Sequence, residues 1–488
     1  MDSEAQGSKG RFAHGPLMQM DIRHPSSEAL QRILRRLILA TILGCGVFTT
    51  LWYDRPDLLV MGILLSFVPF ILLRAKRGNL SIDFFSPEVG FPLVYVAYMF
   101  STTIDLPVVS QFNIAIPWTQ WIYYSVGLAA YLVGAASIRA TSPPCIPVTG
   151  PQFWNLSGFK VSVLLLVAMG FMGRLVKVAQ YGFPLFHPEE QELRVKYAGG
   201  YMGTLTLAFE AAFLCLVLFL IVCRPSWKKR TFIILLMLLL VFDSLTGDSR
   251  GCIMRIFIAS LVIIHYVYSR LRLRSLIAFA LVAVILVSGL GTYRDMSVFG
   301  DVHVQGLEDK GFTSYTFWLA NIYESLRVTT ESFYMLTRHV PAHASYTYGT
   351  TSLASLAIPF PGHQPGPGEL IKKELNMDFI GFGAATTILG PLYLDGGWIA
   401  IALGMMLWGM LAKWLYVRML GASSFFWVLT YAYFAQNQFK AIKDDMFPEL
   451  GPLFVVLYFA LVHFIASGKW RDYLHGALRC YEARPRQA

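Results

Sequence analysis

The chain is 488 residues long, and 55% of its residues are hydrophobic and 15% aromatic, whereas only 14% are charged. A soluble domain carries about a quarter charged residues, but here apolar runs recur from Leu37 to Ser467 without a polar domain between them. The composition excludes a cytosolic enzyme, a disordered chain and a disulfide-rich secreted scaffold. It indicates an all-α polytopic membrane protein.

The charge pattern and the cysteines agree with this class. The formal net charge is +10, but the excess of Lys and Arg falls in short clusters between apolar runs, as in membrane proteins that follow the positive-inside rule. This pattern predicts contact with a lipid bilayer and no nucleic-acid partner. The six cysteines show no CxxC spacing, so neither a zinc site nor a disulfide framework is expected.

Transmembrane helices are expected wherever roughly 20 apolar residues follow one another. About twelve such runs are present, at 36–53, 57–73, 86–104, 118–137, 158–179, 203–223, 231–246, 252–269, 275–292, 397–417, 422–439 and 449–467. The basic clusters lie in every second connection between spans, which places them on one side of the membrane. The polar N-terminal segment is expected on that same side. Both termini are therefore expected in the cytoplasm of a multi-pass inner-membrane protein.

The expected organisation has five parts. A cytoplasmic tail over 1–35 precedes a membrane region of nine helices over 36–292, and a large outer loop follows over 293–396. Three C-terminal transmembrane helices over 397–467 lead into a basic cytoplasmic tail over 468–488.

The outer loop is not of low complexity. Between Tyr315 and Val340, apolar and charged residues alternate at helical spacing, which predicts an amphipathic helix in the outer interface or over the bundle. The Pro/Gly-rich piece over 359–368 cannot be the interior of a helix. The apolar stretch over 381–397, interrupted by five glycines and Pro391, indicates a re-entrant or tilted segment that is buried against protein.

Three arginines lie on the outer side, where the positive-inside rule disfavours them. Arg194 lies in the outer loop from about Tyr181 to Met202, Arg250 lies in a tight turn between two spans, and Arg294 directly follows the ninth span. A guanidinium offers a rigid bidentate fork to phosphate oxygens, so the three together predict a clamp for a lipid diphosphate. The alternative is that each arginine pairs with a nearby carboxylate.

His363 lies in the Pro/Gly-rich turn, shortly before Lys372 and Lys373. An imidazole titrates near neutral pH, so it can take a proton from an attacking hydroxyl group. The alternative is a surface histidine without a catalytic role. Three other histidines are expected on the same face, namely His187, His339 and His343.

Several ionisable residues fall inside expected spans, where they are costly and by default functional. They are Arg174, Lys177, Glu210, Asp243, Arg255 and Lys413. The alternative is structural pairing, of Arg174 with Glu210 and of Asp243 with Arg255. The chain contains no P-loop, no HExxH sequence and no Asp-rich metal motif, so neither a nucleotide-driven pump nor a metal or other cofactor is indicated.

Five short motifs occur in a fixed order along the chain. They are Gly182-Phe-Pro-Leu-Phe followed by Arg194, Thr246-Gly-Asp-Ser-Arg-Gly, Thr-Tyr-Arg294, Ile-Pro-Phe-Pro-Gly-His-Gln, and Leu389-Gly-Pro-Leu-Tyr-Leu-Asp-Gly-Gly. In this order, and with the late outer loop, the chain resembles the Wzy-type O-antigen and capsule polymerases over roughly residues 80 to 450. The related O-antigen ligases share the same general plan.

The resemblance implies a fold like that of the C-type membrane glycosyltransferases and a metal-independent, inverting transfer at the periplasmic face. Donor and acceptor would both be undecaprenyl diphosphate-linked oligosaccharides, delivered by a flippase, with a chain-length regulator as a further partner. By position, the diphosphate would be bound by Arg194, Arg250, Arg294 and Lys372. Two of these, Arg194 and Arg294, would also stabilise the charge on the departing diphosphate. His363 would act as the base. An O-antigen ligase and a transporter of lipid-linked oligosaccharides are the alternatives; the transporter is disfavoured because no internal repeat is visible.

Overall fold

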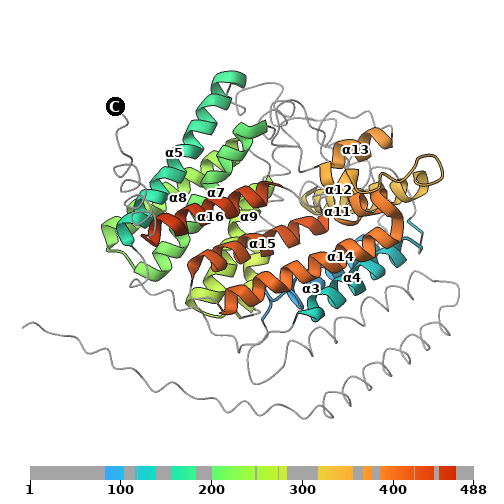
Figure 1. The fold of residues 1–488 in the computed structure, drawn as a ribbon, viewed down its shortest axis with the longest axis horizontal. Helices are drawn as coiled ribbons and strands as arrows, with labels where there is room; N and C mark the ends of the chain where they lie inside the picture. Colours follow the sequence, from blue (N-terminus) through green and yellow to red (C-terminus); the bar gives the residue numbers. More distant parts are fainter. Residues whose placement is uncertain are drawn as a thin grey trace, which may run out of the picture.

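The computed structural model describes residues 83–103, 116–117, 119–138, 155–182, 200–247, 250–272, 274–282, 317–354, 367–375, 385–421, 424–443 and 450–468. Within these ranges the regular elements are all helices, which confirms the expected all-α class for this part of the chain (Figure 1). The expected spans over 36–53 and 57–73 lie outside the described residues.

Helices occupy the positions of the other expected spans. They are α3 (Gly90–Thr103), α4 (Thr119–Ser137), α5 (Leu156–Tyr181), α7 (Gly200–Cys223), α8 (Trp227–Gly247), α9 (Arg250–Ile263) with its π-helical end η4 (Ile264–Tyr268), α14 (Leu389–Gly421), α15 (Phe425–Lys443) and α16 (Leu450–Ala466). Most helix ends lie within a few residues of the expected ends, but α14 begins eight residues before the expected start at 397. Of the ninth expected span, residues 275–282 are described and helical. Among the described residues, α5, α14 and α7 from Gly203 are long and apolar enough to cross a membrane, and the number of about twelve spans stays a prediction.

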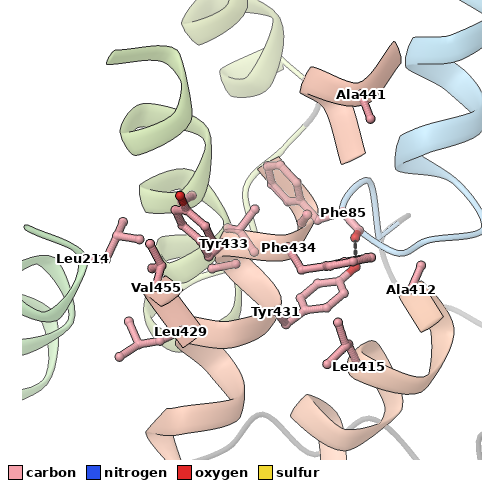
Figure 2. Close-up of a cluster of buried hydrophobic side chains, with 14 of the residues drawn as sticks. Phe85, Leu214, Ala412, Leu415, Leu429, Tyr431, Tyr433, Phe434, Ala441 and Val455 are labelled. Atoms are coloured by element: carbon pink, nitrogen blue, oxygen red, sulfur yellow. Dashed lines mark hydrogen bonds between the residues drawn. The ribbon is translucent and has the colours of Figure 1, made fainter. Parts of the chain in front are cut away.

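Helix α15 joins two groups of helices. On one side α4 lies along α14, with α3 beside them, and on the other side α5, α7 and α16 pack together (Figure 1). Helix α15 contacts α3, α9, α14 and α16, and most of its side chains are buried on all faces. Figure 2 shows its aromatic side chains pointing to opposite sides, Tyr433 toward Leu214 and Val455, and Tyr431 toward Phe85 and Leu415.

Two glycines allow α4 and α14 to approach closely. A Cβ atom on Gly134 would lie 2.0 Å from the carbonyl oxygen of Met406, and one on Gly409 would lie 2.2 Å from that of Tyr131. Small residues that bring helix backbones together are typical of contacts between transmembrane helices, because packing rather than water exclusion drives their association.

The opposite face of α14 is apolar and exposed. Ile399, Leu403 and Leu407 recur at the four-residue spacing of one helix face, and all three are exposed. Two exposed tryptophans, Trp398 and Trp414, lie near the ends of this stripe, about 24 Å apart along the helix axis. This distance is close to the thickness of the hydrocarbon core, and tryptophans are enriched at its two boundaries. The stripe is therefore a lipid-facing surface.

A carboxylate holds the chain before α3 to two other elements, η4 and α14. Asp83 accepts hydrogen bonds from the hydroxyl groups of Tyr266 and Tyr416, both at 2.8 Å, and His265 Nε2 lies 3.3 Å from its Oδ1. Burial by itself raises the pKa of Asp83, but His265, Tyr416 and Tyr266 together lower that pKa below its usual value. The hydroxyl group of Tyr431 also donates to the carbonyl oxygen of nearby Phe85 (Figure 2).

The outer loop contributes α11 (Phe317–His339), α12 (Thr350–Ala354) and α13 (Pro367–Glu374). Helix α11 confirms the helix expected between Tyr315 and Val340, but its polar residues are not all exposed. Arg327 and Glu331 are buried and pair with each other at 2.7 Å, because α11 packs against α3 and α14. Helix α13 begins at a proline, which fits the first turn of a helix but not its interior.

Candidate functional site

The expected site residues lie mostly outside the described part of the chain. Arg194, Arg294 and His363 fall in undescribed ranges. Arg250 is the first residue of α9, where the backbone alone is described, and Lys372 lies in the last turn of α13. The diphosphate clamp and the base therefore stay predictions, and the site is built below from its described neighbours.

A buried ion pair lies one to two turns from Arg250 along α9. Arg255 Nη2 donates to Glu210 Oε1 of α7 at 2.6 Å, and the hydroxyl group of Tyr433 of α15 donates to Glu210 Oε2 at 2.8 Å. We call this contact of three helices the α7–α9–α15 junction. The sequence had suggested other pairs for these charges, and the side chain of one proposed partner, Asp243, lies outside the described residues.

This pair fixes a guanidinium group inside an apolar bundle. The side chain of Glu210 is 3% exposed and that of Arg255 is 14% exposed. Transfer of such charges from water into protein costs several kcal/mol for each ion, so the pair persists only because its hydrogen bonds are well made. The carboxylate of Glu210 thereby holds the guanidinium group of Arg255 in one direction.

Two more cations are buried on α5, the neighbour of α7. Arg174 and Lys177 are 8% and 2% exposed, and each takes part in polar or electrostatic contacts, so neither is free. One turn before Arg174, Gly170 brings α5 against α7, because a Cβ atom there would lie 2.4 Å from the ring of Phe209. The buried positive charge in the half of the molecule expected on the outer side is thus spread over several helices.

Two lysines at the end of α15 were not among the predicted site residues. Lys440 and Lys443 lie in its last turn, which by the expected order of spans is on the outer side. The rule that singled out the three arginines would have found these lysines too, since they directly follow the expected span over 422–439. They add positive charge to the side of the molecule where the phosphate site is expected.

A second feature, on the side expected to be outer, is a break in α14. Gly396 is extended, with φ −179°, and Gly397 adopts φ +62°, which favours glycine. The break frees the carbonyl groups of Leu394 and Asp395 from helical hydrogen bonding. They accept instead from the backbone N–H groups of Thr347 at 2.9 Å and Tyr348 at 3.1 Å.

The side chain of Asp395 extends this attachment. Its carboxylate accepts from the hydroxyl group of Thr347 at 2.6 Å and from the backbone N–H groups of Thr351 at 3.0 Å and Ser352 at 2.9 Å. It thus caps the first turn of α12, which otherwise has no partners for these N–H groups. We call this set of hydrogen bonds the Asp395 cap.

The cap fixes the chain on one side of the stretch that contains His363. Helix α12 packs against α13 as well as α14, and α13 also contacts α14. Residues 355–366, which connect α12 to α13, lie outside the described residues. The stretch over 389–395, where burial was expected, is indeed buried, and whether it re-enters the membrane stays a prediction.

Within the described ranges, no three His, Cys, Asp or Glu side chains come close enough together to hold a metal ion. The basic residues expected on the outer side instead offer N–H donors, which suit phosphate oxygens.

Comparison with known proteins identifies the family of this chain. The model of the family "O-antigen polysaccharide polymerase Wzy" matches residues 148–469, which is well over half of the chain. No match was found among curated proteins or among solved structures, so the expected likeness to C-type glycosyltransferases stays a prediction. The family match includes α5, α7, α9, α15 and the outer loop with the Asp395 cap. This chain, an integral membrane protein, belongs to the Wzy family of O-antigen polysaccharide polymerases.

Proposed function

We propose that this protein elongates a bacterial surface polysaccharide at the periplasmic face of the inner membrane. Family membership implies a polymerase that acts on lipid-linked oligosaccharide repeat units, and the match over 148–469 is the observation that carries the proposal. The donor is a glycan on undecaprenyl diphosphate, and the acceptor is a second lipid-linked repeat unit. A flippase supplies both, and a chain-length regulator is a further partner.

The proposed reaction is an inverting transfer. A hydroxyl group on the terminal sugar of the acceptor attacks the anomeric carbon of the donor, the new glycosidic bond forms as the anomeric bond to phosphate breaks, and undecaprenyl diphosphate leaves. His363 takes the proton of the attacking hydroxyl group. Negative charge grows on the diphosphate as its bond breaks, and preorganised cations lower the barrier by stabilising that charge.

The cations that stabilise this charge are Arg194, Arg250, Arg294 and Lys372. Arg250 has the most support from its surroundings, because it begins α9, the helix that carries the buried Arg255. A diphosphate near the start of α9 would also meet the N-terminal end of a helix, where N–H groups and the helix dipole favour anions. Side chains alone stabilise the negative charge on the diphosphate, without a metal or cofactor.

A direct assay tests this function. Purified protein in detergent receives an undecaprenyl diphosphate-linked repeat unit without added nucleotide or metal, and the products are resolved on a gel. We expect a ladder of lipid-linked oligomers. The absence of a ladder, with transfer once lipid A-core is supplied, would identify a ligase instead, and no transfer in either assay would favour a transporter.

Variants then test the phosphate clamp. Arg194→Ala, Arg250→Ala and Arg294→Ala should each abolish the ladder, and the Lys variants should lose much of the activity because a point charge lacks bidentate geometry. Arg272→Ala is the control, since Arg272 is exposed and belongs to the basic cluster expected on the cytoplasmic side. Full activity in all three outer variants would disprove the clamp.

A further inference from the structure

Helix α15 carries a polar face in its outer half. Tyr433, Gln436 and Lys440 are three and four residues apart, so they share one face of the helix. Tyr433 donates to Glu210 of α7, which directs this face toward the α7–α9–α15 junction. The opposite face is directed elsewhere, because the amide of Gln438 donates to the hydroxyl group of Tyr131 of α4 at 2.8 Å.

The side chain of Gln436 is buried there without a hydrogen-bond partner. It is 1% exposed, and in the described structure neither its Oε1 nor its Nε2 makes a hydrogen bond. Buried amide groups are nearly always hydrogen-bonded, since burial without a partner costs free energy. A leucine of similar size would be more favourable for the fold at this position, so the amide calls for a reason other than stability.

The cations on the side of α15 that carries Gln436 indicate what kind of group would bind the amide. Arg255, held in place by Glu210, offers guanidinium N–H donors on one side of the junction, and Lys440 offers ammonium donors one turn farther out on α15. The neighbouring amide of Asn437 is already used, since it donates to the carbonyl oxygen of Tyr433 at 2.9 Å. A ligand for this set must be anionic and rich in acceptor oxygens.

We propose that Gln436 and Lys440, together with Arg255, bind the diphosphate group of the lipid-linked glycan. The inference rests on the proposed polymerase function and places part of the diphosphate site inside the helix bundle, on α15. The amide of Gln436 donates to a phosphate oxygen, which satisfies its Nε2, and its Oε1 accepts from a hydroxyl group of the first sugar. The outer ends of α9 and α15, with Arg250 and Lys443, lie on the side from which the substrate enters.

Binding of undecaprenyl diphosphate, the product that leaves, tests the proposal without catalysis. Purified protein in detergent is titrated with this lipid, and the rise of the thermal unfolding midpoint gives the affinity. For Gln436→Leu we expect affinity to fall about tenfold, the effect of one hydrogen bond to a charged group, while the unfolding midpoint of the free protein stays the same or rises. Gln436→Met is the second variant, and Lys440→Met should weaken binding as well.

Gln438→Leu on the opposite face of α15 is the matched control. It removes a hydrogen bond that the fold uses, so it should lower the unfolding midpoint and leave affinity unchanged. Unchanged affinity in both Gln436 variants would overturn the inference, and so would a wild-type protein that makes a ladder but does not bind the lipid. A wild-type protein that makes no ladder and binds no lipid would instead refute the polymerase function itself.

Discussion

The carboxylate of Asp395 joins the outer loop to α14 through one side chain. It accepts hydrogen bonds from Thr347, Thr351 and Ser352, and it is only 7% exposed. Hydrogen bonds to a charged group are stronger than those between neutral groups, and buried donors that lose their acceptor are costly. The position of α12, and of the chain that leads from it toward His363, therefore depends on this residue.

Asp395→Ala should destabilise the protein by about 2 kcal/mol, through loss of the cap and its charged acceptor. Polymerisation should fall more steeply, on the order of 100-fold, because small displacements of reacting groups have large effects on rate. Trypsin cleavage after Lys372 and Lys373 should become faster as α13 loosens. Asp395→Asn keeps one acceptor and should recover part of each property.

Asp83→Asn is the control, because Asp83 is another carboxylate that accepts a hydrogen bond from α14, at the far end of that helix, and is partly buried. It should lower the unfolding midpoint and leave the cleavage rate at Lys372 unchanged. Equal cleavage and activity in wild type and Asp395→Ala would refute a positioning role for Asp395.

At the residue scale, the sequence identifies charges but not their partners. Glu210 and Arg255 stand out in apolar runs, yet their pairing depends on how α7, α9 and α15 pack, which no local pattern specifies. Gln436 could not be found, because an uncharged amide in a span is unremarkable until its burial and missing partners are known. Asp395 was visible only as part of a motif, since its role depends on the break at the two glycines that follow it.

The contact between α4 and α14 depends on glycines in both helices. Gly409→Ala and Gly134→Ala each place a methyl group within 2.2 Å of a backbone carbonyl oxygen, so the helices must move apart. We expect a loss of about 1–3 kcal/mol, as for overpacking in a core, measured as a lower thermal unfolding midpoint in detergent. Gly421→Ala, at a glycine of α14 with no atom within 4 Å of the added methyl group, should have little effect.

At the scale of elements, apolar runs predict where most helices lie but not how they end or pack. Helix α14 begins at Leu389, eight residues before the expected span at 397, because the broken segment before it is itself helical. Helix α11 has an alternating pattern that is compatible with a surface helix, but neighbouring helices cover its Arg327–Glu331 pair. Such differences arise from tertiary contacts, which local hydropathy does not record.

For the whole molecule, the order of spans predicts that both termini are cytoplasmic. A fluorescent protein fused to the C-terminus should therefore fluoresce, and alkaline phosphatase fused after Gly182, which ends α5, should be active. Alkaline phosphatase fused after Pro225, between α7 and α8, should be inactive. Phosphatase activity at the C-terminus would contradict the predicted orientation and, with it, the outer position of Lys440 and Lys443.

The burial of α15 has a consequence for the biosynthesis of this protein. Its outer half carries Gln436, Asn437, Gln438 and Lys440, so bilayer lipid is a poor solvent for it, and its stability in the membrane depends on α9, α14 and α16. During translation α15 leaves the ribosome before α16 does, because α15 comes first in the chain. The insertion machinery must therefore hold α15 beside α14 until α16 arrives, and a nascent chain that stops before α16 presents a polar helix to lipid, where membrane quality control can recognise it.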